Sequence, residues 1–141
     1  MSDAKTISVL GICGSLRKGS FNMAALRTAI ELKPAGMTVT VADISQIPLY
    51  NEDVRAEGFP APVETLRQQI KAADALLFAC PEYNYSMSGV LKNAIDWASA
   101  RQISPLPASL ARSSVPPPAW QAARGRRAIC AAAWSFSTCT R

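Results

Sequence analysis

Hydrophobic positions along the first hundred residues follow two alternating patterns. Short runs rich in β-branched residues are typical of buried strands, whereas apolar residues three or four positions apart predict amphipathic helices. Strands are predicted at 6–12, 37–42 and 75–80, and helices at 22–33, 63–73 and 90–98. A proline-containing stretch, residues 43–62, is predicted as a long loop. The predicted order is therefore β-α-β-α-β-α.

This order predicts one α/β domain. Strands that alternate with helices form a parallel sheet with right-handed crossovers, and strands that are apolar throughout need helices on both faces of the sheet. We therefore expect a doubly wound parallel sheet. Ligands of such sheets bind beyond the carboxyl ends of the strands, where the strand order reverses. The loops after the first and third predicted strands are thus the candidate binding loops.

The loop after the first strand, with the sequence GSLRKGSFN, has the composition of an anion-binding loop. Its glycines let backbone N–H groups approach a ligand, and Ser15, Ser20 and Asn22 can donate hydrogen bonds beside the positive end of a helix dipole. Arg17 and Lys18 add positive charge. The alternative is a polar loop in which Ser20 or Asn22 simply caps the helix. Neither GxxxxGK[ST] nor GxGxxG is present, so neither an ATPase loop nor a Rossmann dinucleotide loop is indicated.

The loop after the third strand, with the sequence PEYNYSMSG, suits a planar ring. A rigid proline start, two tyrosines and several amide and hydroxyl groups can cover one face and the edge of a hydrogen-bonding ring such as a flavin. The alternative is a tyrosine-containing surface turn. Because both loops follow parallel strands, we expect them to meet in one crevice.

The composition of the chain limits the kinds of catalytic group that it can contain. The chain has 141 residues with 49% hydrophobic and 18% charged residues, as in one globular domain. It has no apolar run of about 20 residues and no signal-peptide pattern at its start, so we expect a cytoplasmic protein without a membrane partner. It contains no histidine, and its four cysteines form no CxxC. We therefore predict no catalytic side chain and no metal site, and expect a cofactor to supply the chemistry.

GSLRKGSFN followed by PEYNYSMSGVLKNAIDWAS resembles the paired signature of NAD(P)H-dependent FMN reductases, a family that includes flavin, quinone, azo-dye and chromate reductases. The resemblance implies a flavodoxin-like fold, bound FMN, NAD(P)H as cosubstrate and a small-molecule electron acceptor. It also implies a homodimer or tetramer with the flavin near the subunit boundary. The segment IPLYNED, residues 47–53, resembles the family as well.

The resemblance also implies individual roles for residues of this chain. Those implied to hold the FMN phosphate are Ser15, Arg17, Ser20, Phe21 and Asn22. Those implied to line the ribityl chain and isoalloxazine ring are Pro81, Glu82, Tyr83, Asn84 and Ser88. The helix that follows carries Lys92, Asn93 and Trp97.

Residues 100–141 break the pattern. They contain six arginines, five prolines, no lysine and no acidic residue, and no strand is predicted among them. A shifted reading frame explains this change. Reverse translation in the displaced frame yields, for one choice of third bases, a string containing GAIVGA and SPG that resembles the family's fourth strand and loop. We therefore interpret residues 1–99 as the first part of an FMN-binding domain, and 100–141 as a frameshifted, disordered tail.

The tail leaves other functions open. Residues 1–99 hold nine Lys/Arg and ten Asp/Glu, so the net charge of +5 belongs to the tail. A natural Arg/Pro/Ala extension could bind RNA or an anionic surface, which would make the chain a basic-tailed nucleic-acid binder. Another alternative is a non-catalytic flavodoxin-like module that binds a flavin, a phosphate or a partner. The leading prediction is an FMN-dependent oxidoreductase without a nucleic-acid partner, in a copy that lacks strands four and five and is unstable or inactive.

Overall fold

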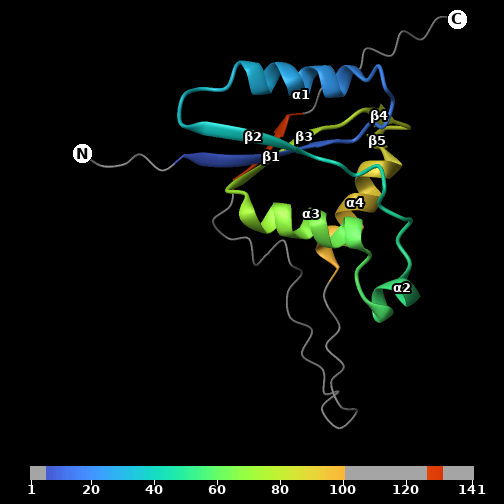
Figure 1. Ribbon diagram of the computed structural model, residues 1–141. Helices are drawn as coiled ribbons and strands as arrows, with labels where there is room; N and C mark the ends of the chain where they lie inside the picture. The colour runs from blue at the N-terminus through green and yellow to red at the C-terminus, as the bar shows by residue number, and fades with distance from the viewer. Residues whose placement is uncertain (1–5, 101–126, 132–141) are drawn as a thin grey trace, which may run out of the picture.

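The computed structural model describes residues 6–100 and 127–131 and shows a parallel sheet between layers of helices (Figure 1). The sheet has the strand order β2-β1-β3-β6. Its strands are β1 (Ile7–Cys13), β2 (Met37–Ala42), β3 (Ala75–Ala79) and β6 (Arg127–Ala131). The helices are α1 (Phe21–Glu31), α2 (Glu52–Glu57), α3 (Ala61–Ala72) and α4 (Gly89–Ser99). A separate antiparallel hairpin is formed by β4 (Glu82–Tyr83) and β5 (Ser86–Met87).

Strand β1 lies at the centre of the described sheet. Gly11 pairs in parallel register with Val41 of β2 on one side and with Leu77 of β3 on the other. The chain therefore crosses from one side of β1 to the other between β2 and β3. The strand order reverses at this place, so the carboxyl ends of β1 and β3 form the switch point at which doubly wound sheets bind ligands.

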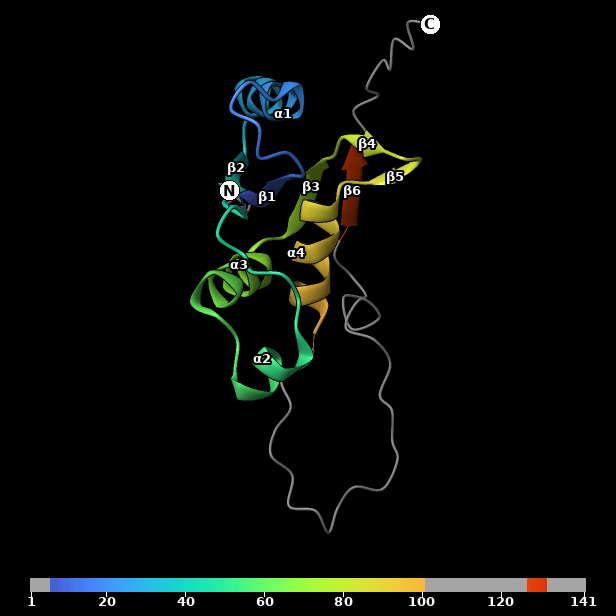
Figure 2. The ribbon, with the colours of Figure 1, turned by 90° about the vertical axis from the view of Figure 1, so that its right-hand side faces the viewer.

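Helix α1 covers one face of the sheet, and α3 and α4 cover the other (Figures 1 and 2). Side chains of β1 alternate between these layers, as the pleat requires. Leu10 and Ile12 join the core beneath α3 and α4. Cys13 packs with Leu26 of α1 on the opposite face. α1 packs tightly against β1 at Gly11, where an added Cβ would lie 2.9 Å from Leu26 Cδ1.

The predicted class and element order are confirmed. Each of the three predicted strands and three predicted helices has ends within two residues of the observed ones, and the second strand matches at both ends. The strand order β2-β1-β3 is that of flavodoxin-like sheets. None of the helices in the described ranges is both long and apolar enough to cross a membrane.

Helix α2 is an element that the sequence pattern misses, because it lies inside the predicted loop 43–62. It has six residues, too few to show a helical period. Local signals for it exist: the Asn51 side chain caps it by accepting from Asp53 N over 2.8 Å, and Gly58, with φ 140°, ends it. The loop is therefore a more structured segment than its prolines indicate.

Strand β6 corrects the prediction that no strand occurs between residues 100 and 141. Residues 127–131 pair in parallel with β3, with Ala75 opposite Arg127 and Ala79 opposite Ala131. The edge of β3 offers unpaired N–H and C=O groups, which a short segment can satisfy through its backbone. This edge is therefore occupied, contrary to the prediction of an uncovered one. The other predictions for the tail concern residues 101–126 and 132–141, which lie outside the described residues.

Candidate functional site

The two candidate binding loops meet at Gly14. Its backbone N–H donates to the Ala79 carbonyl oxygen at the end of β3 over 2.8 Å. Its own carbonyl oxygen accepts a hydrogen bond from Ser88 Oγ over 2.6 Å. A Cβ at position 14 would lie 2.9 Å from that hydroxyl oxygen and 3.2 Å from Leu91 Cβ, so no larger residue fits without movement. The predicted convergence of the two loops at the switch point is therefore present in the structure.

The first loop ends at the N-terminus of α1, where two backbone donors are left over. Ser20 is the N-cap, and its Oγ accepts from Met23 N over 3.2 Å. The N–H groups of Phe21 and Asn22, in the first turn, have no acceptor within the part of the chain that the structure describes. Ser20 is thus a helix cap, as the alternative interpretation holds, and the cap still leaves the helix N-terminus open to an anion.

Asn22 carries an unpaired polar atom in this turn. The residue is 9% exposed, and its Oδ1 is buried with no hydrogen-bond partner among the described residues. A buried polar atom without a partner costs about 1–3 kcal/mol. Because Oδ1 accepts hydrogen bonds and cannot donate them, it is suited to a ligand that brings a hydrogen-bond donor to the first turn of α1.

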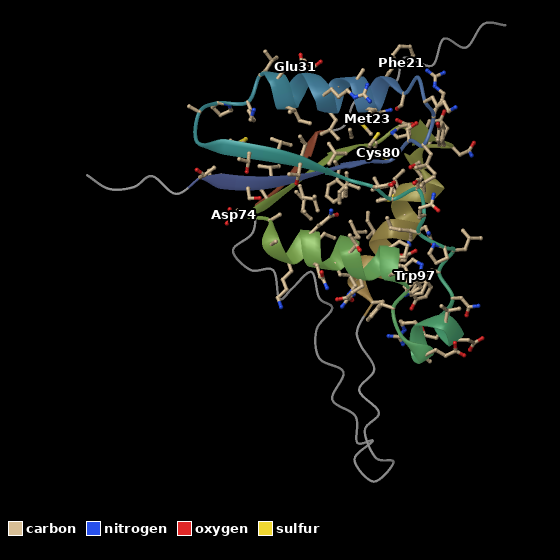
Figure 3. The ribbon with its side chains drawn as sticks, viewed as in Figure 1. Phe21, Met23, Glu31, Asp74, Cys80 and Trp97 are labelled. Atoms are coloured by element: carbon tan, nitrogen blue, oxygen red, sulfur yellow. The ribbon has the colours of Figure 1, made fainter. Side chains whose placement is uncertain are left out.

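Arg17 adds charge beside this turn. Its guanidinium donates to the Gly19 carbonyl oxygen and lies 5.4 Å from the centroid of the Phe21 ring. Within residues 6–100 and 127–131 no acidic side chain pairs with it. Phe21 is 82% exposed. It lies at the N-terminal end of α1 (Figure 3). The loop therefore presents an uncompensated positive charge next to the unpaired N–H groups, which favours an anion there.

The second loop contains the β4–β5 hairpin, which the sequence pattern assigns to a loop without strands. Its turn residues, Asn84 and Tyr85, have φ values of 51° and 60°, as a two-residue type I′ turn requires. Tyr83 is 58% and Tyr85 is 99% exposed. The pattern misses the hairpin because its strands have two residues each and the turn lacks the usual glycine. Of the residues assigned to the ring, the hairpin exposes Glu82, Tyr83 and Asn84, whereas Pro81 and Ser88 are buried.

The residues carried by α4 hold the segment before α2 and do not line the two loops. Asn93 Nδ2 and Trp97 Nε1 both donate to the Pro48 carbonyl oxygen over 2.8 Å, and Asn93 Oδ1 accepts from Tyr50 N over 2.8 Å. Trp97 lies on the opposite side of the sheet from Phe21 (Figure 3). Lys92 forms an ion pair with Asp96, which lies one turn further along the helix. α4 therefore begins at the candidate site and anchors the IPLYNED segment with its later turns.

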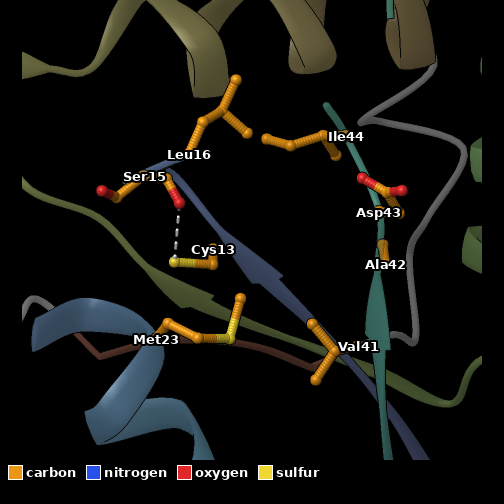
Figure 4. A pocket seen from close by; sticks show the side chains of 8 residues that line it. All are labelled: Cys13, Ser15, Leu16, Met23, Val41, Ala42, Asp43 and Ile44. Atoms are coloured by element: carbon orange, nitrogen blue, oxygen red, sulfur yellow. Dashed lines mark hydrogen bonds between the residues drawn. The ribbon is translucent and has the colours of Figure 1, made fainter. Parts of the chain in front are cut away.

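A pocket of about 190 Å³ opens beside the first loop, where β1 and β2 end (Figure 4). No sequence feature predicts it. Its lining residues are Cys13, Ser15, Leu16, Met23, Val41, Ala42, Asp43 and Ile44. Hydrogen bonds from Ser45 hold the pKa of the Asp43 carboxyl below its usual value, so that side chain is anionic at neutral pH. A phosphate would be repelled there, which leaves the α1 N-terminus as the side of the loop that suits an anion.

Comparison with known proteins identifies the family to which the chain is similar. The model of a family described as NADPH-dependent FMN reductase matches residues 7–117. An NAD(P)H-dependent FMN reductase of Pseudomonas aeruginosa is 72% identical over 99 residues, which are 70% of this chain and 52% of the relative. A quinone reductase of Escherichia coli is 50% identical over 105 residues, covering 73% and 56%.

A solved structure has a similar fold. The flavoenzyme NAD(P)H:(acceptor) oxidoreductase FerB from Paracoccus denitrificans superposes with a TM-score of 0.63 and 37% identity, over 67% of this chain and 52% of that one. The chain thus spans about half the length of the curated relatives it matches. The match to the family model covers most of the chain and includes both loops of the candidate site. The chain belongs to the NADPH-dependent FMN reductase family.

Proposed function

We propose that this chain is the FMN-binding part of an NAD(P)H-dependent oxidoreductase that passes electrons to a flavin, a quinone or a similar small molecule. The observation that carries the proposal is the junction at Gly14, which joins the loop that leads to the N-terminus of α1 to an exposed aromatic hairpin at the switch point. The names of the relatives support the reaction class. The proposal includes a cytoplasmic location and assembly as a homodimer or tetramer.

The phosphate of FMN would lie at the N-terminus of α1. The N–H groups of Phe21 and Asn22 point out of the first turn without acceptors in the described part of the chain, and the NH2 group of the Asn22 side chain can donate beside them. The other groups that would hold the phosphate are the hydroxyls of Ser15 and Ser20 and the guanidinium of Arg17. A dianionic phosphate would be stabilised there by the helix dipole and by charge-assisted hydrogen bonds.

The isoalloxazine ring would lie along the hairpin. Pro81 begins this loop, Tyr83 offers an exposed ring, and Glu82 and Asn84 offer groups for the polar edge of the flavin. FMN, when bound, accepts hydride from NAD(P)H and passes electrons onward. The chain's own task is to bind and orient the flavin, so the proposal assigns no catalytic acid or base.

Binding of FMN and riboflavin tests the proposal. The purified chain should bind added FMN, and the same chain with a restored reading frame, as proposed below, should also oxidise NAD(P)H when a quinone is added. The double variant Ser20→Ala/Asn22→Ala should lose FMN affinity but little riboflavin affinity, because riboflavin lacks the phosphate. Tyr83→Ala should instead shift the flavin absorbance. The control is Asn51→Ala, which removes a helix cap away from both loops.

Three results would contradict parts of this proposal. No binding of FMN would refute the flavin site. Equal losses of FMN and riboflavin affinity in the double variant would refute the phosphate assignment. FMN binding by the frame-restored chain without oxidation of either nicotinamide would favour the non-catalytic module over the oxidoreductase.

We further propose that the gene's reading frame shifts near codon 100, which would leave this copy damaged. The support is the change in composition after residue 99, with six arginines and no acidic residue. The nucleotide sequence of codons 98–104 should then show an inserted or deleted base relative to the genes of its relatives. Restoring the frame should raise FMN retention and NAD(P)H oxidation together with subunit assembly. An unbroken frame in a chain that already binds FMN would refute this part.

A further inference from the structure

Ser88 differs from the other polar residues assigned to the ribityl chain and ring, Glu82, Tyr83 and Asn84, because its side chain is enclosed. It is 1% exposed and is the N-cap of α4, which starts beside the hairpin (Figure 2). Its Oγ accepts from Leu91 N over 3.3 Å and donates to Gly14 O over 2.6 Å. A hydroxyl has one proton to donate, and here Gly14 receives it. The hydroxyl therefore has no donor left for a ligand.

We propose that Ser88 is a positioning residue, which acts on FMN through Gly14 and does not itself touch the cofactor. The inference rests on the proposed function, because it concerns the same site. Gly14 is the first residue of the first loop, GSLRKGSFN. Its N–H donates to Ala79 O at the end of β3, and its carbonyl oxygen accepts from Ser88 Oγ at the start of α4. The Ser88 hydroxyl thus fixes the position of the first loop relative to the hairpin and α4.

The Ser88–Gly14 hydrogen bond preorganises the first loop for binding. If the Ser88 hydroxyl is removed, Gly14 O loses its donor, and the loop that begins there gains freedom before binding. A ligand that needs this loop must then restrict that freedom itself, which lowers affinity. FMN needs both loops because of its phosphate, whereas riboflavin depends mainly on the hairpin. Loss of the hydroxyl should therefore weaken FMN binding more than riboflavin binding.

Ser88→Ala in the full chain tests this inference, with FMN and riboflavin titrated separately and binding followed by quenching of flavin fluorescence. We expect FMN affinity to fall about tenfold, equal to the loss of one well-placed hydrogen bond, and riboflavin affinity to fall less than about threefold. Circular dichroism at the titration temperature checks that each variant is folded. Ser88→Thr, which keeps the hydroxyl, should recover most of the FMN affinity.

A second variant disturbs the same contact from the side of Gly14 and keeps the Ser88 hydroxyl itself. In Gly14→Ala the new Cβ would lie 2.9 Å from Ser88 Oγ and push it from the carbonyl. It should show the same selective loss of FMN affinity, and the double variant should lose little more, because both changes break one contact.

The outcomes separate this inference from the proposed function. If the wild-type chain binds neither flavin, the proposed function fails and this inference fails with it. If the wild type binds FMN but folded Ser88→Ala binds it equally well, only the positioning role is refuted. Equal losses for FMN and riboflavin would also refute it, since they would indicate a general structural role.

Discussion

Replacing Trp97 with phenylalanine tests how firmly α4 holds the segment before α2. Trp97 is completely buried, with 0% exposure. Its indole Nε1 donates to Pro48 O over 2.8 Å, and its ring meets the Tyr50 ring edge to face with centroids 4.9 Å apart. Phenylalanine keeps an aromatic ring at this position but lacks the N–H group and fills less volume.

The expected loss of stability follows from these two differences. Loss of the hydrogen bond costs about 0.5–1.5 kcal/mol, and the lower part of this range applies because Pro48 O keeps Asn93 as a second donor. The missing ring atoms remove buried contacts worth about 2 kcal/mol, at roughly 0.8 kcal/mol for each methylene-sized group. With incomplete collapse of the space, the free energy of unfolding should fall by about 2–4 kcal/mol.

Thermal unfolding followed by circular dichroism measures this change. For a domain of this size the expected decrease in Tm is about 6–15 °C. Phe59→Leu is the control, because the Phe59 ring lies further from Trp97, at 6.3 Å between centroids, and makes no hydrogen bond through its ring. That variant should lose less than about 1.5 kcal/mol. If Trp97→Phe loses no more stability than Phe59→Leu, the proposed anchoring of the segment by Trp97 is wrong.

Two further predictions concern the hairpin and the segment around α2. Tyr85→Gly should raise Tm, because Tyr85 has φ 60° and glycine relieves roughly 1 kcal/mol of backbone strain. Asn84→Gly, at φ 51°, should raise Tm less, because asparagine tolerates the left-handed backbone region. Equal increases in Tm would contradict this explanation. Hydrogen bonds from Arg55 and then Tyr50 lower the pKa of the Glu52 carboxyl. A folded pKa below the unfolded one gives stability that is present above the unfolded pKa and lost as pH falls through the folded pKa. The Tm of the wild type should therefore fall more on acidification across this window than that of Glu52→Gln, and parallel Tm curves would refute the assignment.

Much of the site can be located from the sequence, because its position depends on chain order. The runs at 6–12 and 75–80 identify two strands, and parallel strands bring the loops that follow them to one edge of the sheet. The predicted junction of the two loops is observed at Gly14. The roles of the side chains are harder to predict. Asn93 and Trp97 belong to a family motif, yet their polar atoms contact the segment at Pro48.

Local patterns along the chain were enough to determine the α/β class, the element order and the places of the two candidate loops, because hydrophobic periodicity reports which face of each element is buried. The tertiary structure decided the features that depend on contacts between distant residues. The Ser88–Gly14 hydrogen bond joins residues 74 positions apart, and the pairing of residues 127–131 with β3 uses backbone groups that carry no sequence signal. Such contacts arise only once the elements have packed, because their partners are chosen by position in space.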